Sequence, residues 1–549
     1  MTDSTTALSA SPTPGTETPA RRRVAAAGAG VGVVLLLAAM AGAAGALTRP
    51  LWLDEVVTHL EASTAGGVAK SMFGGVDFHP PVYAALASLV GTLAGGATPV
   101  TDRLPSLFAA LLTIAVIGAA LRARHSWPAT LAGALALSAH PLFIAQAFEA
   151  RPYALWILTS ALAAESVREQ RAHRGIYAAI AAILLCTTHY FGALSLGTIG
   201  AAVVFTAWLA PAMTGDGDGR STSAAHRAWR ALLPLLAGVA ALLLILPLVR
   251  AQFAAIGGRS WVSPATSADL SFFVRFPWGW RPAFYLILAG VLLAALGRIP
   301  AAARALRLPS WTSLGAAEWA MLSLALIPVI VAIASVLYTP VLVLRYSAPA
   351  AMAVAVAVAI AVERFPGHAR WIAVAWLARA ALFAFASAGT AGRDEASRVA
   401  ADAQVVRELE QRGVTTLSPS RHDAYQLSAA TKDASVAWLV VADSTIDRAA
   451  ADPATGLTRN FMLVERDFGR ATKRAFDFPV TLSLDDARRR FVVAILRAPE
   501  QAPADSIWLP GFEHLCDAGP RFAVYRAPGT MPSVSAAACP SLRGARPAR

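Results

Sequence analysis

The sequence predicts a polytopic α-helical membrane protein with a smaller α/β domain at its C-terminal end. Of the 549 residues, 56% are hydrophobic and only 15% are charged, whereas a soluble protein usually carries about 25% charged residues. The apolar residues form runs close to the length of about 20 that a bilayer core requires. Short basic clusters separate these runs, and the composition becomes that of a soluble domain after residue 390.

The apolar runs predict about 11 crossings of the membrane. Residues 1–23 are expected to form a disordered cytoplasmic tail, because they are rich in Ser, Thr and Pro and end in three arginines. The run 24–47 is longer than the core of a signal peptide and more runs follow, which predicts a retained first helix. The further runs are 104–121, 128–145, 152–164, 175–188, 192–210, 231–249, 282–296, 317–337, 341–362 and 371–388.

The net charge of +13 indicates membrane orientation rather than nucleic-acid binding. Residues 1–390 contain 26 Lys and Arg against 15 Asp and Glu, whereas residues 391–549 contain 21 against 19. Most of the excess lies in short loops between apolar runs, which the positive-inside rule assigns to the cytoplasm. No basic stripe interleaved with aromatic residues is present, as a nucleic-acid binder would require. We therefore expect a multi-pass plasma-membrane protein with a cytoplasmic N-terminus and an extracytoplasmic C-terminal domain.

The segment 79–97 is expected not to cross the membrane. If it crossed, every later basic loop would change sides, so the loop 48–103 should lie on the outer face with juxtamembrane or re-entrant helices. The C-terminal domain, 391–549, is predicted to contain a helix that ends at Gly413 and strands at 437–441, 491–496 and 522–525. Its Cys516 and Cys539 can pair in an oxidising exterior, whereas Cys186 lies in an apolar run.

Two groups of polar residues follow the first span. Asp54 and Glu55 are paired carboxylates at a membrane edge, where ionisable residues are functional candidates, and one of them can deprotonate a hydroxyl. The alternative is a solvated helix N-terminus, where acids favour the macrodipole. Asp77, His79 and Tyr83 flank two prolines. This second group can meet a phosphate, although in isolation it favours a turn with an anchoring aromatic residue.

Three later motifs place a cation or an imidazole beside an aromatic residue at the same predicted depth. Their residues are Glu149, Arg151, Tyr153, His189, Tyr190, Arg345 and Tyr346. The forked donors of arginine suit a phosphate, and snorkelling with aromatic-belt anchoring is the alternative for any one motif. Convergence of all three on one face indicates a site. The segment 250–281, rich in Trp and Arg, is expected to be an interfacial loop whose aromatics form a belt rather than stack on sugar.

The motifs together resemble the GT-C membrane glycosyltransferases, specifically the protein O-mannosyltransferase-like family of bacteria. The matches, in the family's order, are LWLDE (51–55), HPPVY (79–83), RLPS (103–106), EARPY (149–153), HYFG (189–192) and RY (345–346). The resemblance implies a GT-C domain over residues 24–390 that moves a sugar from a polyprenyl-phosphate carrier to a cell-envelope lipid, glycan or protein hydroxyl at the outer face. Ala- and Arg-rich usage fits an actinobacterial enzyme, which favours mannose or arabinose.

Carried over by residue, the resemblance makes Asp54 the base that activates the acceptor, with Glu55 beside it. It assigns the donor phosphate to four residues: His79, Arg151, Arg345 and Tyr346. The remaining pocket residues are Asp77, Tyr83, Glu149, Tyr153, His189 and Tyr190. No second carboxylate is placed as a nucleophile, so a single displacement with inversion is expected. No cofactor is firmly implied, although some members of the family have a divalent metal near the site, and this sequence has no clear metal set.

Two other functions stay open at this stage. A transporter or lipid flippase needs ionisable groups near the membrane midplane and two related halves, whereas the polar groups here cluster at one edge. A catalytically inactive GT-C relative in envelope assembly is the other alternative, and retention of both acids at 54 and 55 argues against it.

Overall fold

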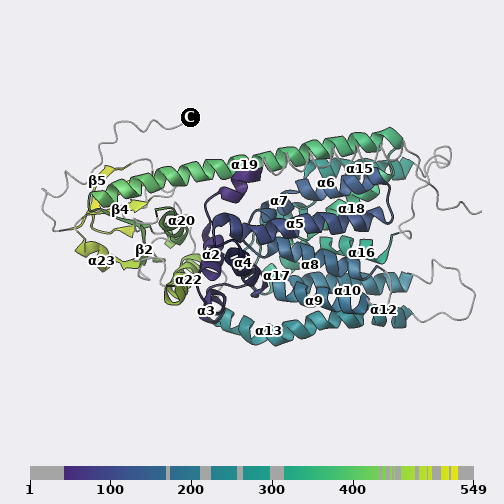
Figure 1. Ribbon diagram of the computed structural model, residues 1–549, viewed down its shortest axis with the longest axis horizontal. Helices are drawn as coiled ribbons and strands as arrows, with labels where there is room; N and C mark the ends of the chain where they lie inside the picture. The colour runs from purple at the N-terminus through teal and green to yellow at the C-terminus, as the bar shows by residue number, and fades with distance from the viewer. Residues whose placement is uncertain are drawn as a thin grey trace, which may run out of the picture.

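The computed structural model describes residues 43–168, 174–209, 224–255, 262, 264–296, 314–418, 420–431, 436–440, 446–447, 450–451, 459–476, 481–490, 492–496, 508–518 and 521–528. The predicted tail 1–23, most of the predicted first helix 24–47 and Cys539 lie outside these residues. The molecule is elongated, with a helical bundle at one end and a β-sheet at the other (Figure 1). Below, the domain end of the bundle is the end nearest the sheet, and the opposite one is the far end.

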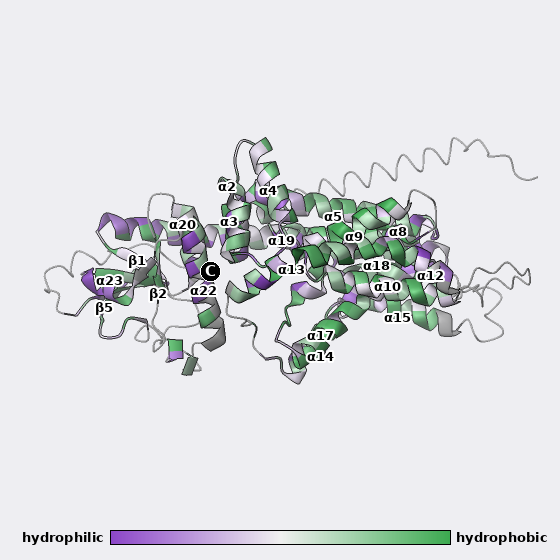
Figure 2. Cartoon of the chain, turned by 90° about the horizontal axis from the view of Figure 1, so that it is seen from below, coloured by the Kyte–Doolittle hydropathy of each residue, from purple (hydrophilic) through white to green (hydrophobic). Residues whose placement is uncertain are grey.

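The bundle is built from helices whose residues are mostly hydrophobic (Figure 2). Large hydrophobic side chains are exposed along it, including Leu244 at 82% and Phe383 at 74%, as expected of helices in lipid. Small residues of α18 lie fully buried at its centre. The described helices are α5 (Pro99–Arg122), α6 (Trp127–Ala139), α7 (Pro141–Ala147), α8 (Tyr153–Ser166), α9 (Arg174–Thr188), α10 (Gly192–Leu209), α12 (Ala224–Leu232), α13 (Leu236–Ala255), α14 (Ser267–Arg275), α15 (Arg281–Leu296), α16 (Ala316–Ser323), α17 (Ile327–Leu337), α18 (Ala350–Glu363) and α19 (Gly367–Gln411).

Helices fall where apolar runs were predicted, while the number of crossings stays a prediction. Among the described residues, 4 helices are long and apolar enough to cross a membrane, or 5 if the bent pair α6 and α7 forms one span. Several other predicted crossings are shorter apolar helices, such as α9 and α15. The segment 79–97 contains the 12-residue helix α4 (Val82–Leu93). At 1.5 Å per residue it is about 18 Å long, too short to cross.

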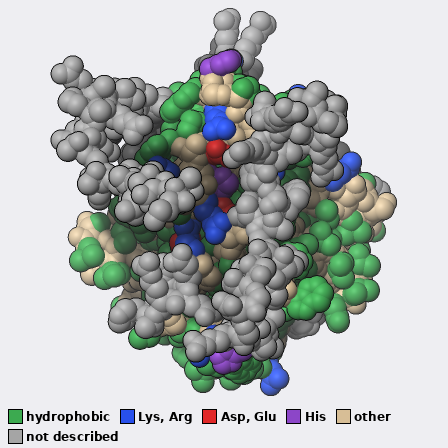
Figure 3. Space-filling model, turned by 90° about the vertical axis from the view of Figure 1, so that its right-hand side faces the viewer, with side chains coloured by type: hydrophobic (Ala, Val, Ile, Leu, Met, Phe, Trp, Pro, Cys, Tyr) green, Lys and Arg blue, Asp and Glu red, His purple; other side chains and the backbone are tan. Residues whose placement is uncertain are grey.

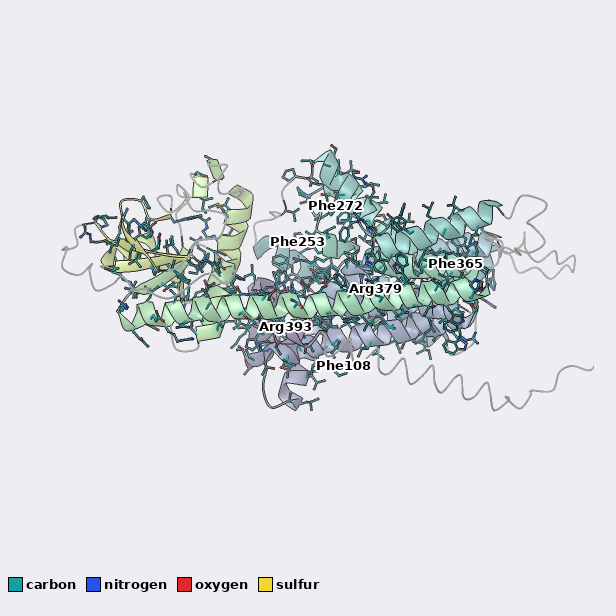
Figure 4. The ribbon with its side chains drawn as sticks, turned by 90° about the horizontal axis from the view of Figure 1, so that it is seen from above. Phe108, Phe253, Phe272, Phe365, Arg379 and Arg393 are labelled. Carbon is teal, nitrogen blue, oxygen red and sulfur yellow. The ribbon has the colours of Figure 1, made fainter. Side chains whose placement is uncertain are left out.

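The boundary predicted at residue 391 lies inside a helix. α19 has 45 residues and continues from the bundle into the C-terminal domain without a break. Figure 4 shows Arg379 and Arg393 along its length. Glycines let the helical segment 43–48 approach it closely: a Cβ on Gly392 would lie 2.3 Å from the Gly45 carbonyl oxygen, and one on Gly45 would lie 2.2 Å from that of Gly389. The change in composition marks where α19 leaves the apolar bundle.

The C-terminal residues form a six-stranded sheet in the order β3-β2-β1-β4-β6-β5. The first four of these are parallel neighbours, β6 pairs antiparallel with β4, and β5 pairs antiparallel with β6. The predicted strands correspond to β2 (Val436–Val440), β4 (Val492–Leu496) and β6 (Phe522–Arg526), whereas β1 (Thr415–Ser418), β3 (Thr481–Ser483) and β5 (Glu513–Asp517) are short and polar and were not predicted. Cys516 in β5 is disulfide-bonded.

Helices cover both faces of this sheet. Alternate residues of β4 face opposite sides: Val492 packs in one core with α19 and α20 (Arg421–Thr431), and Val493 packs in the other with α22 (Arg459–Phe476) and α23 (Leu484–Arg489). α20 also packs on α2 (Leu53–Ser63), and α22 packs on α3 (Gly67–Gly74). The domain therefore covers the short helices that follow the first predicted span.

Among the described residues, basic side chains from several of the predicted inner loops lie at the far end of the bundle, whereas the clusters at 21–23 and 298–307 lie outside the described residues. Arg370 donates to Glu363 (2.9 Å), whose other carboxylate oxygen accepts from the Ser126 N–H (2.9 Å). His125 pairs with Glu318 (2.7 Å). Figure 3 looks onto this end and shows charged and His side chains gathered in its middle, with hydrophobic side chains beside them. These bonds join α6, α16, α18 and α19.

The glycine contact gives a test of the fold. Gly392→Ala should lower the thermal stability of the protein in detergent, because the added methyl must displace the backbone at Gly45, and overpacking of this kind costs roughly 1–3 kcal/mol. Gly367→Ala in the same helix is the matched control, since a Cβ there meets nothing within 4 Å. Equal melting temperatures for the two variants would contradict the close approach of the segment 43–48 to α19.

Candidate active site at the domain end of the bundle

The predicted site residues meet at the domain end, around the start of α2. This helix begins after Trp52, whose N–H donates to Glu55 Oε2 (3.2 Å), and its first turn carries Asp54 and Glu55. A carboxylate at this position satisfies a free N–H and favours the helix dipole. The turn that precedes α4, the turn between α7 and α8, and the short helix η4 (Leu344–Ser347) bring the other motifs to the same place.

Glu55 forms a buried ion pair instead of facing a substrate. Its two carboxylate oxygens accept from Nε and Nη2 of Arg103 (2.8 and 2.7 Å), and Oε1 also accepts from the Ala150 N–H (2.8 Å). Both ion-paired side chains are fully buried. Burial alone would raise the pKa of Glu55, but the hydrogen bonds and charge of Arg103 outweigh it and lower the pKa. The catalytic role expected for Glu55 stays a prediction, whereas these contacts favour a role in positioning the chain, because its oxygens already accept from Arg103 and Ala150.

Arg103 also fixes the segment before α2. Its Nη1 donates to the carbonyl oxygens of Leu47 and Arg49 (both 2.7 Å), and its Nη2 donates to that of Pro50 (3.1 Å). Tyr83 has a similar structural role, because its hydroxyl contacts Ser106 Oγ (2.8 Å) and donates to the Asp102 carbonyl (2.9 Å). It is 2% exposed, and it joins α4 to α5. The pocket role expected for Tyr83 stays a prediction, and its contacts favour a structural role.

Asp54, one residue before Glu55, lies beside a confined arginine. Its Oδ2 accepts from Arg345 Nη2 (3.1 Å), and 26% of its side chain remains exposed. The Arg345 guanidinium lies 5.2 Å from the Trp52 ring centre and 5.5 Å from that of Tyr153. Contacts of this kind with two aromatic rings attract and orient the cation. Asp54 is thus an accessible carboxylate next to an oriented positive charge.

Arg151, Asp77 and His79 form a second polar group next to the first. Arg151 Nη2 lies 3.1 Å from Asp77 Oδ1, and Nη1 donates to the Asp54 carbonyl (3.1 Å). Burial would raise the pKa of Asp77, but the charge of Arg151 holds it well below its usual range. His79 Nδ1 is 2.7 Å from Asp77 and 2.6 Å from Arg151. Burial and the Arg151 charge lower the pKa of His79, so the ring is neutral at neutral pH.

Aromatic rings form the inner wall of the site. The His189 ring stacks on Trp156, with centres 4.5 Å apart and planes 10° apart, and it lies 5.1 Å from the His79 ring. Tyr346 packs edge-on against Phe191 (4.6 Å) and contacts His189 (6.1 Å). His189 is 4% exposed. The wall is held rigidly against the charged groups.

Glu149 is a partly buried acid near the same charges. Burial and the neighbouring Glu55 charge raise its pKa to about 7, against the opposing effects of Arg345 and Arg49. Its Oε2 is buried without a hydrogen-bond partner among the described residues. The group therefore changes charge near neutral pH, immediately beside the arginine that holds Asp54.

Several members of the site have no signal in the sequence. Trp156 lies within an apolar run, where an aromatic residue is unremarkable, whereas Phe191 belongs to the HYFG motif but was not singled out. Tyr190 was predicted to line the pocket, but its hydroxyl donates to Gln252 of α13 (2.6 Å). Gln252 belongs to the segment 250–281 that was expected to be a loop, whereas α13 continues to Ala255.

Within the described residues, no group of three or more His, Cys, Asp or Glu side chains can hold a metal ion, and Asp54 and Asp77 are each paired with an arginine.

Comparison with solved structures identifies the fold. The chain is similar to the crystal structure of ArnT from Cupriavidus metallidurans in the apo state, with a TM-score of 0.56 and 14% identity over 91% of this chain and 98% of that one. The structure of the same protein bound to undecaprenyl phosphate gives a TM-score of 0.54, with 14% identity over 92% and 99%. The helical GT-C type of fold predicted from the motifs is confirmed. No family model and no curated protein matches the sequence.

The two buried acids of α2 give a test of the Glu55 assignment. Glu55→Gln should destabilise the protein by about 3–5 kcal/mol, because it leaves the buried Arg103 charge without its partner. Glu61→Gln should change stability less, because burial and the Asp77 charge raise the pKa of Glu61 well above its ordinary range and favour the neutral form that Gln imitates. The measurement is thermal unfolding in detergent at pH 7.

The pH dependence provides the control for that comparison. The pKa of Glu55 is lowered, so its stabilising effect is complete above its ordinary value of 4.5 and is lost as the pH falls through the lowered value. The difference between the wild type and Glu55→Gln should therefore shrink in acid. Equal losses for Glu55→Gln and Glu61→Gln at pH 7 would contradict the assignment.

Proposed function

We propose that the protein is a glycosyltransferase that moves a sugar from a polyprenyl-phosphate carrier to a hydroxyl group. The observation that carries this proposal is the convergence of an accessible carboxylate, Asp54, with two confined arginines, Arg151 and Arg345. Transfer from a phosphate-linked sugar needs a base for the nucleophile and cations for the leaving phosphate. The fold it shares with ArnT, which has been crystallised with undecaprenyl phosphate, supports the same carrier.

Arg345 and Arg151 suit the leaving phosphate. Arg345 is held between two rings and Arg151 is 3% exposed, so both charges are oriented before the substrate binds, and preorganised charge of this kind is the strongest means of stabilising a leaving anion. His79 adds a donor in one of its two tautomers. When Nδ1 accepts from Arg151, the proton of the neutral ring lies on Nε2, which faces the Tyr153 hydroxyl (3.4 Å) and can donate to a phosphate oxygen. Tyr346 extends this side of the pocket.

Asp54 suits the acceptor. Its carboxylate takes the proton from the acceptor hydroxyl as that oxygen forms a bond to the anomeric carbon. The bond from the anomeric carbon to the phosphate oxygen breaks in the same step, and polyprenyl phosphate leaves with the bonding electron pair. A single displacement of this kind inverts the anomeric centre. Asp77, although close, is occupied by Arg151 and the Phe78 N–H (2.7 Å), so it orients the arginine rather than the acceptor.

The membrane orientation, the acceptor and the sugar are proposed from the family resemblance. The basic far end would face the cytoplasm, so the site and the C-terminal domain would lie at the outer face of the plasma membrane. The acceptor would then be a cell-envelope lipid, glycan or protein, and mannose or arabinose the sugar. The domain that covers α2 and α3 would meet the acceptor beside Asp54.

Transfer of radiolabelled sugar from a polyprenyl-phosphate donor by the purified protein tests the proposal. Asp54→Asn should reduce the rate by roughly 10²–10⁴-fold, because the amide cannot take the acceptor proton. Asp394→Asn, on the exposed surface of α19, is the matched control and should retain the wild-type rate. An Asp54→Asn variant that transfers sugar at the wild-type rate would exclude this base, and a wild type inactive with all polyprenyl-phosphate sugars would exclude the function.

Glu149 predicts a particular pH dependence. Because its pKa is about 7, it is neutral in mild acid and negative above neutrality, where it competes with the donor phosphate for Arg345. The KM for the donor should therefore rise as the pH increases from 6 to 8. Glu149→Gln should remove this rise, and Glu410→Gln on the exposed part of α19 should keep it. If the rise persists in Glu149→Gln, another group is responsible.

A further inference from the structure

Gln252, near the C-terminal end of α13, is fully buried with half of its amide unpaired. Its side-chain oxygen accepts from the Tyr190 hydroxyl (2.6 Å), while Nε2 has no hydrogen-bond partner among the described residues. A buried donor left unpaired costs roughly 1–3 kcal/mol, so such a group calls for an explanation. Tyr190 fixes the orientation: since the oxygen is engaged, the NH2 group is the free end.

His189 presents a second unpaired donor one residue away from Tyr190. Its Nδ1 accepts from the Phe191 N–H (3.1 Å), which assigns the proton of the neutral ring to Nε2. That Nε2 is buried and also lacks a partner among the described residues. Its ring is fixed by stacking on Trp156. Because Tyr190, the next residue in the chain, hydrogen-bonds Gln252, the two unpaired donors come from neighbouring segments, the turn between α9 and α10 and the end of α13.

Both donors lie next to the phosphate-binding group. Phe253, which follows Gln252, packs edge-on against Phe78 (6.1 Å), and Figure 4 shows Phe253 at the bundle end that faces the C-terminal domain. Phe78 precedes His79, whose ring lies 5.1 Å from that of His189. The last turn of α13 and the turn between α9 and α10 thus close one side of the pocket around His79.

We propose that Gln252 and His189 form a subsite for a hydroxyl group of the donor sugar, with Tyr190 holding the amide in place. This proposal rests on the proposed function and specifies where the transferred sugar binds. An amide and a neutral imidazole suit an uncharged oxygen, whereas the phosphate is matched by Arg151 and Arg345. A sugar hydroxyl oxygen has two lone pairs and can accept from both Nε2–H groups, and the rings of the inner wall offer a surface on which the sugar can lie.

Binding of two ligands to the purified full-length protein tests the subsite. The ligands are a polyprenyl-phosphate sugar and the same polyprenyl phosphate without sugar. Gln252→Met keeps the length of the side chain and removes the donor, so the Kd for the sugar-bearing ligand should rise about tenfold, as expected for one hydrogen bond. The Kd for bare polyprenyl phosphate should not change. Tyr190→Phe should give a smaller, equally sugar-dependent loss, because it only frees the amide to rotate.

Gln404→Met, at an exposed position of α19, is the matched control and should bind both ligands as the wild type does. Equal weakening of both ligands in Gln252→Met would show that the amide supports the lipid-phosphate site or the fold, and unchanged binding of both would show that it meets no ligand. Either result overturns the subsite. Failure of the proposed function gives a different result. In that case the wild type would bind the sugar-bearing ligand more tightly than bare polyprenyl phosphate but would not transfer the sugar, so the subsite would stand and the transferase would not.

Discussion

The buried ion pair between Glu55 and Arg103 is the interaction on which the site depends. One guanidinium joins the start of α2, the backbone carbonyls of 47–50 and, through the shared carboxylate, the turn at Ala150. Two charges are removed from water to achieve this, which is favourable only because every direction of the guanidinium meets an oxygen. Asp54 is the chain neighbour of Glu55, and Arg151 is the chain neighbour of Ala150. The network that joins Glu55 to Ala150 therefore sets the separation between Asp54 and Arg151.

The proposed chemistry uses groups that lie outside this network. Asp54 is more exposed than Asp77, and the rings of Trp52 and Tyr153 orient the Arg345 guanidinium beside it. The rings of the inner wall are also restricted, because the stacked His189 and Trp156 side chains cannot change rotamer separately. A site of this type has low reorganisation cost when charge develops on a leaving phosphate, which is the usual origin of large rate enhancements.

The C-terminal domain completes the site by packing rather than by supplying its charges. α20 covers α2 through Tyr425 against Leu51 and Val56, and α22 covers α3 and the following turn through Ala471 against Val76. α19 passes into the domain as one helix, and Arg521 fastens the domain onto it through Asp402 and onto α20 through Asp423 (3.0 Å). This continuous connection makes domain and bundle one mechanical unit around the pocket.

The sequence by itself determined the helical membrane architecture, the grouping of basic loops at one end and most of the residues that meet at the other, because apolar periodicity and charge are local properties of the chain. It could not separate Asp54 from Glu55. Adjacent positions on a helix point about 100° apart, and only packing shows that one carboxylate meets Arg103 while the other stays open. Gln252 was equally hidden, since its meaning depends on Tyr190, which lies 62 residues away. Hydrogen-bond partners distant in sequence, and the burial that makes each bond count, exist only once the chain has folded.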